Sequence, residues 1–399
     1  MEKLNKKIFS TLFFSIFTTV TGAGIVVPLL PVYARDLGAG GLYIGLMFGA
    51  FSISRTLFLP YFGRLSDKKG RKPLIVAGLF AYALISVAFI FSDNVETIIA
   101  IRFIHGITSA MIMPVVQAYV GDITPEGSEG LSMGMFNMSM FFGLSIGPLI
   151  GGVINDRFSL EASFLSMGFL ALVGFFLSLF LLPPTRSERV VRKGKPLTAW
   201  RQILSDRTIA GLFLFRFTFT VCIGIIWGFL PILADSEFGL SSSSIGILIM
   251  LGVFVSGSIH TPMGFLSDRV NKQIMVIIGG VITAYAVFSY QLAGDFRDLV
   301  IASIIFGLGG GISMPALMAI AVLKGKQIGA MGSIMAFLTM GHSLGMLVGS
   351  FLAGLMMDIF QLRQAFSLGA IIMAIGVGLF AFLCRQSMDR YGVKNGSSI

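Results

Sequence analysis

Twelve apolar runs of about 20 residues constrain the fold of this chain more than any other feature of its sequence. A helix of about 20 apolar residues is long enough to cross the hydrocarbon core of a bilayer. The runs therefore predict an all-α membrane protein with twelve transmembrane helices, for which the lipid bilayer is a partner. The predicted spans are residues 8–33, 41–62, 74–92, 97–121, 131–154, 163–182, 208–233, 243–263, 274–291, 299–323, 329–356 and 366–384.

The composition excludes several other classes of protein. Hydrophobic residues make up 55% and charged residues 12% of the 399 residues, whereas a soluble domain is about 25% charged. The net charge of +10 does not indicate a nucleic-acid partner, because almost all charged residues fall in the gaps between the apolar runs. Cys222 and Cys384 lie within apolar runs and lack the spacing of metal ligands. We expect no nucleic-acid partner, no metal and no cofactor.

The distribution of Lys and Arg predicts how the chain is oriented in the membrane. An even number of spans places both termini on one side, and most basic residues lie in the segments on that side. Because loops rich in Lys and Arg stay in the cytoplasm, we expect cytoplasmic N- and C-termini and a multi-pass protein of the inner (plasma) membrane. The opposite loops carry four basic residues, Arg35, Arg157, Arg297 and Arg363.

The two halves of the chain repeat each other. Met113-Pro114 in the first half matches Met314-Pro315 in the second, about 201 positions later, and other short stretches match at similar offsets. Repeats of this kind predict two pseudo-symmetric six-helix bundles, with a substrate site near the middle of the membrane where the repeats meet. We expect an N-terminal bundle at 1–183, a cytoplasmic basic linker at 184–206 and a C-terminal bundle at 207–399.

A densely charged segment separates the second and third spans. Its sequence is Gly63-Arg-Leu-Ser-Asp67-Lys-Lys-Gly70-Arg71-Lys-Pro73. We expect a short loop in which the two glycines permit a tight turn. Asp67 can accept hydrogen bonds from backbone N–H groups or pair with Arg71, and Asp122, at the end of the fourth span, is the natural second partner. Such a cluster can hold one conformation and break in another, so it is a candidate conformational latch.

The charged segment recurs in the second half as Gly264-Phe-Leu-Ser-Asp268-Arg-Val-Asn271-Lys. Asp268 takes the place of the first acid, but Asn271 stands where the first copy has its second glycine. We therefore expect Asp268 to form a weaker latch.

These motifs resemble the major facilitator superfamily over essentially the whole chain. The segment 63–73 fits the superfamily's signature G-x-L-x-D-x-x-G-R-K at every fixed position. Arg102-Phe-Ile-His105-Gly106 is similar to the R-x-x-Q-G motif of proton-coupled members, with His105 in place of Gln. Gly143-Leu-Ser-Ile-Gly147-Pro148-Leu-Ile-Gly151-Gly152 matches the G-x-x-x-G-P-x-x-G-G motif of exporters, and Gly24-Ile-Val-Val-Pro28-Leu-Leu-Pro31 resembles the first span of drug/proton antiporters.

The resemblance implies a transporter that works by alternating access. It implies the latch role for Asp67, Arg71 and Asp122, and a role in helix pairing and proton relay for Arg102. The motif in the fifth span implies export, although its glycines and proline would equally suit a close packing seam between helices. The motif consists of Gly143, Gly147, Pro148, Gly151 and Gly152.

The charges inside the predicted spans are all arginines. Arg55, Arg102 and Arg216 lie within spans, and no Asp or Glu does. An arginine at this depth is costly in lipid and normally faces a cavity, so we expect Arg55 and Arg216 to line an electropositive substrate cavity. Arg55 could instead extend its head group to the cytoplasmic face. Trp227 and His342 are further candidates for the cavity.

In the absence of a carboxylate within the spans, His105 is our candidate for carrying the coupling proton. Histidine titrates between about pH 5 and 8, and His105 lies one helical turn from Arg102 on the same face of its span. His260 and His342 could serve the same purpose, or could be neutral histidines that only pack.

The leading interpretation is a monomeric secondary transporter that exports a small amphipathic, neutral or anionic solute or drug in exchange for protons. The alternative is a proton-independent facilitator or exchanger of organic anions or lipid-like solutes, and a third interpretation is a transporter-fold sensor without transport. We do not expect an enzyme, because the chain lacks a clustered nucleophile, a metal-ligand set and a Walker-type loop.

Overall fold

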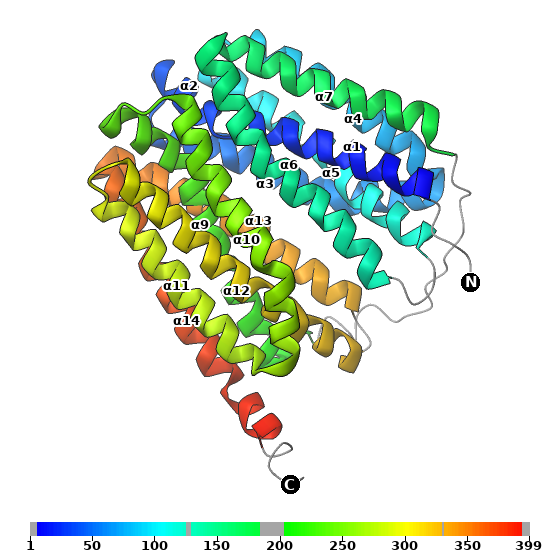
Figure 1. The fold of residues 1–399 in the computed structure, drawn as a ribbon, viewed down its shortest axis with the longest axis vertical. Helices are drawn as coiled ribbons and strands as arrows, with labels where there is room; N and C mark the ends of the chain where they lie inside the picture. The colour runs from blue at the N-terminus through cyan, green and yellow to red at the C-terminus, as the bar shows by residue number, and fades with distance from the viewer. Residues whose placement is uncertain (1–5, 125–128, 184–202, 329–330, 393–399) are drawn as a thin grey trace. The chain divides into compact units, whose positions relative to one another are not determined.

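The computed structural model describes residues 6–124, 129–183, 203–328 and 331–392 (Figure 1). These residues are almost entirely helical and contain no β-strand, and twelve helical segments are long and apolar enough to cross a membrane. The predicted number of spans is confirmed. The helices are α1 (Lys6–Val26), α2 (Leu29–Asp36), α3 (Gly41–Lys69), α4 (Arg71–Ile90), α5 (Val95–Ile123), α6 (Glu129–Arg157), α7 (Leu160–Leu181), α9 (Arg207–Phe238), α10 (Ser242–Arg269), α11 (Lys272–Leu292), α12 (Phe296–Ile328), α13 (Met331–Ile359) and α14 (Leu362–Gly392).

The charged segment at 63–73 is not the loop that the sequence predicts. α3 continues through it to Lys69, α4 begins at Arg71, and Gly70 alone connects them. Gly70 has φ of +89°, which favours glycine, and its N–H donates to the Ser66 carbonyl oxygen at 3.0 Å. Gly63 lies inside α3 and makes no turn. The helix extends because Arg, Leu and Lys are good helix formers, and lysines in its last turn suit the negative end of the helix dipole.

By their contacts, the residues group into two compact units. The first comprises Met1–Val191 and Trp227–Phe254, and the second comprises Arg192–Ile226 and Val255–Ile399. Within the first unit, α1 packs against α6 and α7, α3 packs against α5, and α4 lies between α5 and α7 (Figure 1). Most of the predicted linker at 184–206 lies outside the described residues, so the domain boundaries at 183 and 207 stay predictions.

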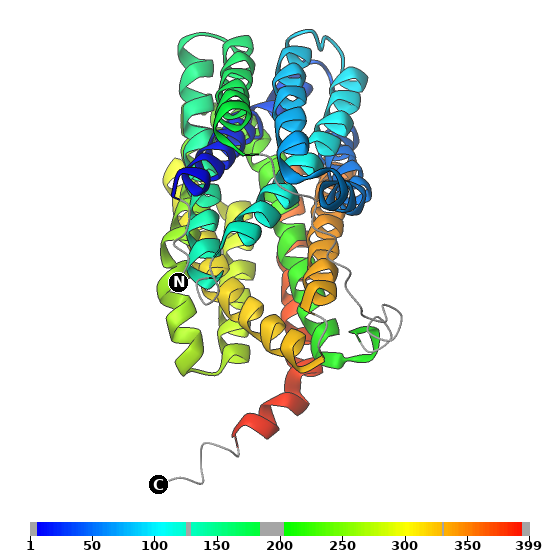
Figure 2. The ribbon, with the colours of Figure 1, turned by 90° about the vertical axis from the view of Figure 1, so that its right-hand side faces the viewer.

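The second unit repeats this type of packing. Its most extensive contacts join α11 to α12 and to α14, and the end of α14 projects past the other helices of the unit (Figure 2). Prolines interrupt equivalent helices in the two halves: Pro60 in α3 corresponds to Pro262 in α10, and Pro114 in α5 to Pro315 in α12. A proline in a helix removes one backbone hydrogen bond and bends the helix there. The two halves therefore share these two proline positions as well as their sequence motifs, whereas Pro148 of α6 has no proline counterpart in α13.

Candidate functional site

The glycines of the fifth-span motif form a close seam between α6 and α1. A methyl group on Gly147 would lie 2.8 Å from the Cα atom of Gly24, and one on Gly151 would lie 2.8 Å from the Cα atom of Ile25. A methyl group on Gly143 would lie 2.9 Å from the Phe17 carbonyl oxygen. The three glycines are spaced four residues apart and therefore share one face of α6. Because backbone atoms meet backbone atoms along this face, the motif sets the distance between α1 and α6.

A second face of the same motif, turned by about 100° from the first, meets the start of α10. A methyl group on Gly152 would lie 2.8 Å from the Cα atom of Ser243, and one on Gly246 would lie 3.1 Å from the Cα atom of Leu149. Pro148 lies between the two seams, and its ring faces Gly24 of α1. The motif thus packs two neighbouring helices at once, as a packing seam requires. Its relation to export stays a prediction of the resemblance.

A hydrogen-bonded cluster, which we call the Asp156 clasp, joins the end of α6 to the beginning of α10. The Asp156 carboxylate accepts hydrogen bonds from the backbone N–H groups of Ser242 at 3.0 Å and Ser243 at 2.8 Å, and also from the Ser243 hydroxyl. The Asn155 side-chain amide donates to the Ser242 hydroxyl at 2.9 Å. The first N–H groups of a helix lack partners within the helix, and a carboxylate there also favours the positive end of the helix dipole. The clasp is therefore an N-cap for α10 supplied by another helix.

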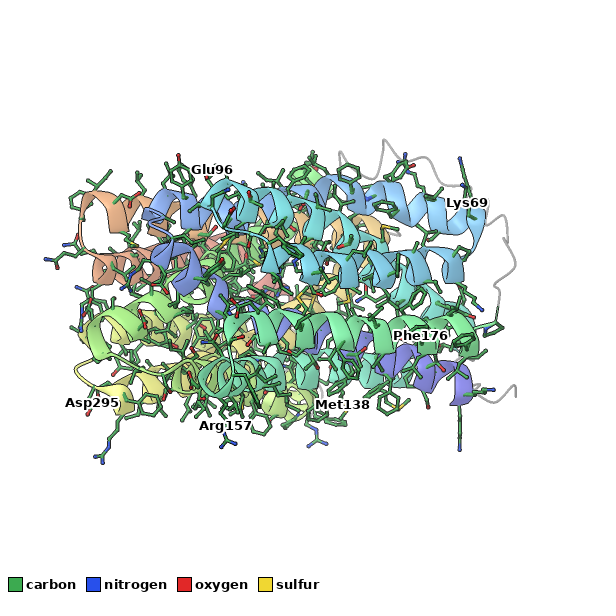
Figure 3. The ribbon with its side chains drawn as sticks, turned by 90° about the horizontal axis from the view of Figure 1, so that it is seen from above. Lys69, Glu96, Met138, Arg157, Phe176 and Asp295 are labelled. Atoms are coloured by element: carbon green, nitrogen blue, oxygen red, sulfur yellow. The ribbon has the colours of Figure 1, made fainter. Side chains whose placement is uncertain are left out.

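Sequence reasoning missed the Asp156 clasp. Nothing in the sequence singles out Asn155 or Asp156, because the backbone N–H groups that Asp156 binds are present in every residue except proline. The available signal was the run of four serines from Ser241 to Ser244, which is typical of a helix start. Arg157, next to the clasp, points away from the helices (Figure 3).

An ion pair lies near the same end of the first unit. Arg35 of α2 contacts Asp235 of α9, with 3.1 Å between the Nη1 and Oδ2 atoms, and each side chain is one-third exposed. An ion pair this exposed contributes only about 0–1 kcal/mol. It therefore links α2 to α9 weakly, whereas the Asp156 clasp links α6 to α10.

Arg102 and His105 meet inside the first unit, as their spacing on one helix predicts. The Arg102 Nη1 and His105 Nδ1 atoms are 3.3 Å apart, and the two residues are 3% and 2% exposed. Gly106 lets this part of α5 approach α3, because a methyl group there would collide with the Ser54 side chain and lie 3.0 Å from the Arg55 backbone nitrogen. The glycine of the fourth-span motif therefore brings the arginine and the histidine against α3.

Aromatic rings from two neighbouring helices enclose this pair. The His105 ring contacts Tyr82 and Phe51 edge-on, with ring centroids 4.6 and 5.2 Å away. The Arg102 guanidinium carbon lies 4.5 Å from the centroid of the Phe51 ring and 5.3 Å from that of Phe48. A cation over an aromatic face is stabilised by the ring quadrupole. The rings thus stabilise the buried positive charge of Arg102, which no carboxylate among the described residues contacts.

Arg55 lies on α3 in the same unit. Its Nε atom is buried without a hydrogen-bond partner among the described residues, as are Arg102 Nε and His105 Nε2. Burial of Arg55 Nε does not favour the alternative in which this side chain extends to water. These buried nitrogen atoms could form hydrogen bonds with a ligand. The assignment of Arg55 to a substrate cavity stays a prediction.

The third intramembrane arginine lies in the second unit. Arg216 of α9 donates from Nη1 to the thioether sulfur of Met314, 2.8 Å away. A thioether is a weak acceptor, so this contact compensates the guanidinium charge poorly. His342 is half-buried on α13 of the same unit, and Trp227 is half-buried on α9 in the first unit. The assignment of these two residues to a cavity stays a prediction.

The structure brings together two of the residues predicted for the latch. Arg71 donates from Nε to the Asp122 carboxylate at 3.0 Å and from Nη1 to the Ser66 hydroxyl at 2.5 Å. The Asp67 side chain lies outside the described residues. Gly70 makes the turn, but Gly63 faces open space within α3. The pairing of Arg71 with Asp122 supports a polar connection between the start of α4 and the end of α5.

The second copy of the signature is built differently. The Asp268 side chain is 76% exposed and lies 4.0 Å from the Lys272 ammonium. The side-chain oxygen of Asn271, which replaces the second glycine, accepts a hydrogen bond from the Gln273 N–H at 2.9 Å and so caps α11. Asn271 has a φ of −66°, so glycine is not needed there. This copy ends one helix and starts the next without the ion pair that Arg71 makes in the first copy.

The family model described as the Major Facilitator Superfamily matches residues 12–224 and 216–392, which together make up nearly the whole chain. The chain belongs to the major facilitator superfamily. Among members of the superfamily, it is similar to Multidrug resistance protein 2 of Bacillus subtilis, with 28% identity over 385 residues and 94% of each chain covered. It is also similar to Quinolone resistance protein NorA of Staphylococcus aureus, with 27% identity over 389 residues that cover 94% of this chain and 95% of the relative.

A solved structure shares the fold of this superfamily member. A bacterial homologue of the human lysosomal transporter Spinster aligns with a TM-score of 0.83 and 13% identity, covering 96% of this chain and 98% of that one. Together with its twelve helices of membrane-spanning length, membership of the superfamily makes this chain a multi-pass transporter of the plasma membrane for a small molecule, and not an enzyme.

Proposed function

We propose that this transporter exports a small amphipathic solute or drug, neutral or anionic, by alternating access and in exchange for protons. The relatives whose names refer to multidrug and quinolone resistance support drug export, as does the exporter motif in α6. The excess of Lys and Arg on one side supports cytoplasmic termini. We further propose that the latch around Arg71 and Asp122 favours one conformation of the cycle, and that the protein acts as a monomer.

The contact between Arg102 and His105 carries the proposal of proton coupling. A guanidinium has only donors, so His105 Nδ1 must accept this hydrogen bond and the neutral ring carries its proton on Nε2. A second proton on Nδ1 would place two donors against each other. Proton binding and the Arg102 contact therefore exclude each other, and a proton that reaches His105 releases Arg102. That release changes how α5 packs against α3, which is how binding of a proton can bias a conformational equilibrium.

The His105→Gln substitution tests this coupling. Glutamine can keep a hydrogen bond with Arg102 but cannot titrate near neutral pH. We expect uptake driven by a pH gradient into inverted vesicles to be lost, while substrate binding and counterflow, which needs no net proton movement, are retained. The measurement is transport with and without an imposed gradient in wild type and variant.

The second candidate function is a proton-independent facilitator or exchanger of organic anions or lipid-like solutes. The buried guanidinium groups, which contact no carboxylate in the described part of the chain, favour it. Wild-type transport that ignores the pH gradient, or a full gradient response in His105→Gln, would establish this function in place of proton exchange. Specific ligand binding without flux would indicate a sensor.

Arg216 provides the test of ligand charge. Since its side-chain contact is a weak thioether acceptor, an acidic group on a ligand would gain a charged hydrogen bond there. We expect Arg216→Ala to weaken binding of an anionic amphiphile by about tenfold or more, and Arg216→Lys to restore binding only in part because lysine lacks the planar fork. Binding is measured by thermal shift or calorimetry on purified protein.

Arg297→Ala is the matched control, because Arg297 is exposed at the start of α12. It should leave binding unchanged. Tight binding of lipophilic cations that Arg216→Ala does not alter would contradict the proposed preference.

A further inference from the structure

A groove between α4 and α7 of the first unit is not used by the transport cycle proposed above. Its volume is about 380 Å³, and it is lined by Lys72, Val76 and Phe80 from α4 and by Phe175 and Leu179 from α7. The Phe80 and Phe175 rings contact each other, with centroids 5.4 Å apart. The wall is almost wholly apolar, and Lys72 supplies its one charged group.

Lys72 lies in the first turn of α4, at the mouth of the groove. Its neighbour Arg71 is held by Asp122 and Ser66, whereas Lys72 contacts no carboxylate in the described part of the chain. The first turn of α4 contains no acid, and the N-cap Gly70 supplies no side-chain cap. The ammonium of Lys72 is therefore available to an anion at the end of an apolar channel.

The groove opens at the end of the first unit that carries the basic signature segment. Lys69 marks this end, and Phe176 of α7 lies toward it (Figure 3). Lys68 and Lys69 are exposed in the last turn of α3, four and three residues before Lys72 in the chain. Several positive charges there attract a phosphate and repel the amine of a zwitterionic head group.

We propose that this groove binds an anionic phospholipid, with an acyl chain along Phe80, Phe175 and Leu179 and its phosphate on Lys72. Apolar side chains between two helices match an acyl chain, and a basic pocket between transmembrane helices on the cytoplasmic side matches an anionic head group. The site therefore belongs to the cytoplasmic leaflet in the orientation proposed above. It does not depend on which solute is transported or on protons.

Quenching by brominated lipids tests the proposal directly. In a background of Trp200→Phe and Trp227→Phe, Leu179→Trp places one reporter in the groove, and Leu165→Trp places one on an exposed part of α7 outside it. The protein is reconstituted into vesicles of phosphatidylcholine with increasing phosphatidylglycerol, either lipid being brominated. We expect the groove reporter to prefer phosphatidylglycerol by about fivefold, and the Leu165→Trp reporter to show no preference.

Two charge variants test whether Lys72 is the residue that binds the phosphate. Lys72→Gln should abolish the preference at the groove reporter, and Lys69→Gln, which removes an equal charge from the last turn of α3, should retain most of it. Equal quenching by both lipids at Leu179→Trp would overturn the proposal. A preference that survives Lys72→Gln, or one that Lys69→Gln removes equally, would also overturn it, because the attraction would then come from the basic surface as a whole. These readouts do not involve transport, so they fail or succeed independently of the proposed function.

Discussion

Gly147→Ala is expected to destabilise the protein strongly, because Gly147 lies in the α1–α6 seam, where backbone atoms meet backbone atoms. The new methyl group would lie 2.5 Å from the Thr21 carbonyl oxygen and 2.8 Å from the Cα atom of Gly24. Both are backbone atoms that cannot move by a change of rotamer, so the two helices must separate. Overpacking of this kind costs about 1–3 kcal/mol or more, against a gain of about 1 kcal/mol from the higher helix propensity of alanine. Apparent melting temperature and the yield of monodisperse protein in detergent measure the effect.

Gly378→Ala is the matched control for this result. Gly378 lies within α14, and a methyl group there would meet no atom within 4 Å. The same substitution should therefore leave stability unchanged or raise it slightly through helix propensity. A Gly147→Ala protein that melts at the wild-type temperature would show that α1 and α6 are not held at the distance described here.

Asp156→Ala is expected to have the next largest effect. The substitution leaves the Ser242 and Ser243 N–H groups without the carboxylate that accepts their hydrogen bonds, and loss of an acidic cap at a helix N-terminus costs about 0.5–2 kcal/mol. We expect a lower melting temperature and slower transport, because the start of α10 is no longer fixed to α6. Asp156→Asn, which keeps one acceptor but loses the charge, should fall between the alanine variant and wild type.

Asp93→Ala is the control for Asp156→Ala, because it measures the general effect of losing an exposed acidic side chain that is not part of the clasp. Asp93 lies in the connection between α4 and α5, is exposed, and accepts a hydrogen bond from the neighbouring Asn94 at 3.0 Å. Its removal should leave melting and transport close to wild type. Equal effects of the Asp93 and Asp156 variants would refute the special role of the Asp156 clasp.

The sequence predicts the number of spans and the close seam of α6 for physical reasons that are local. Hydropathy over about 20 residues reports membrane crossing, and glycines four residues apart report close helix packing. The charged segment after Phe62 was predicted wrongly because hydropathy marks where a helix leaves lipid and not where it ends. α3 continues for seven residues beyond Phe62, to Lys69.

The surroundings of the candidate site were less predictable. The spacing of Arg102 and His105 on one helix is sufficient to predict their contact. The rings around them come from α3 and α4, and no spacing in the sequence relates Phe51 or Tyr82 to His105. The partners of Asp156 are backbone groups, which every residue except proline possesses. Both features arise from packing between helices, which one sequence does not reveal.

The one-residue connection at Gly70 restricts how the length of this chain can vary. Each residue of an α-helix advances the side chains by about 100° around the axis. One residue inserted or deleted between Phe62 and Leu74 would turn the whole of α4 relative to α3 and carry Tyr82 away from the His105 ring, which it contacts at 4.6 Å. Within this segment, evolution can exchange one side chain for another, but an added or removed residue would also move Tyr82 away from the buried pair of Arg102 and His105.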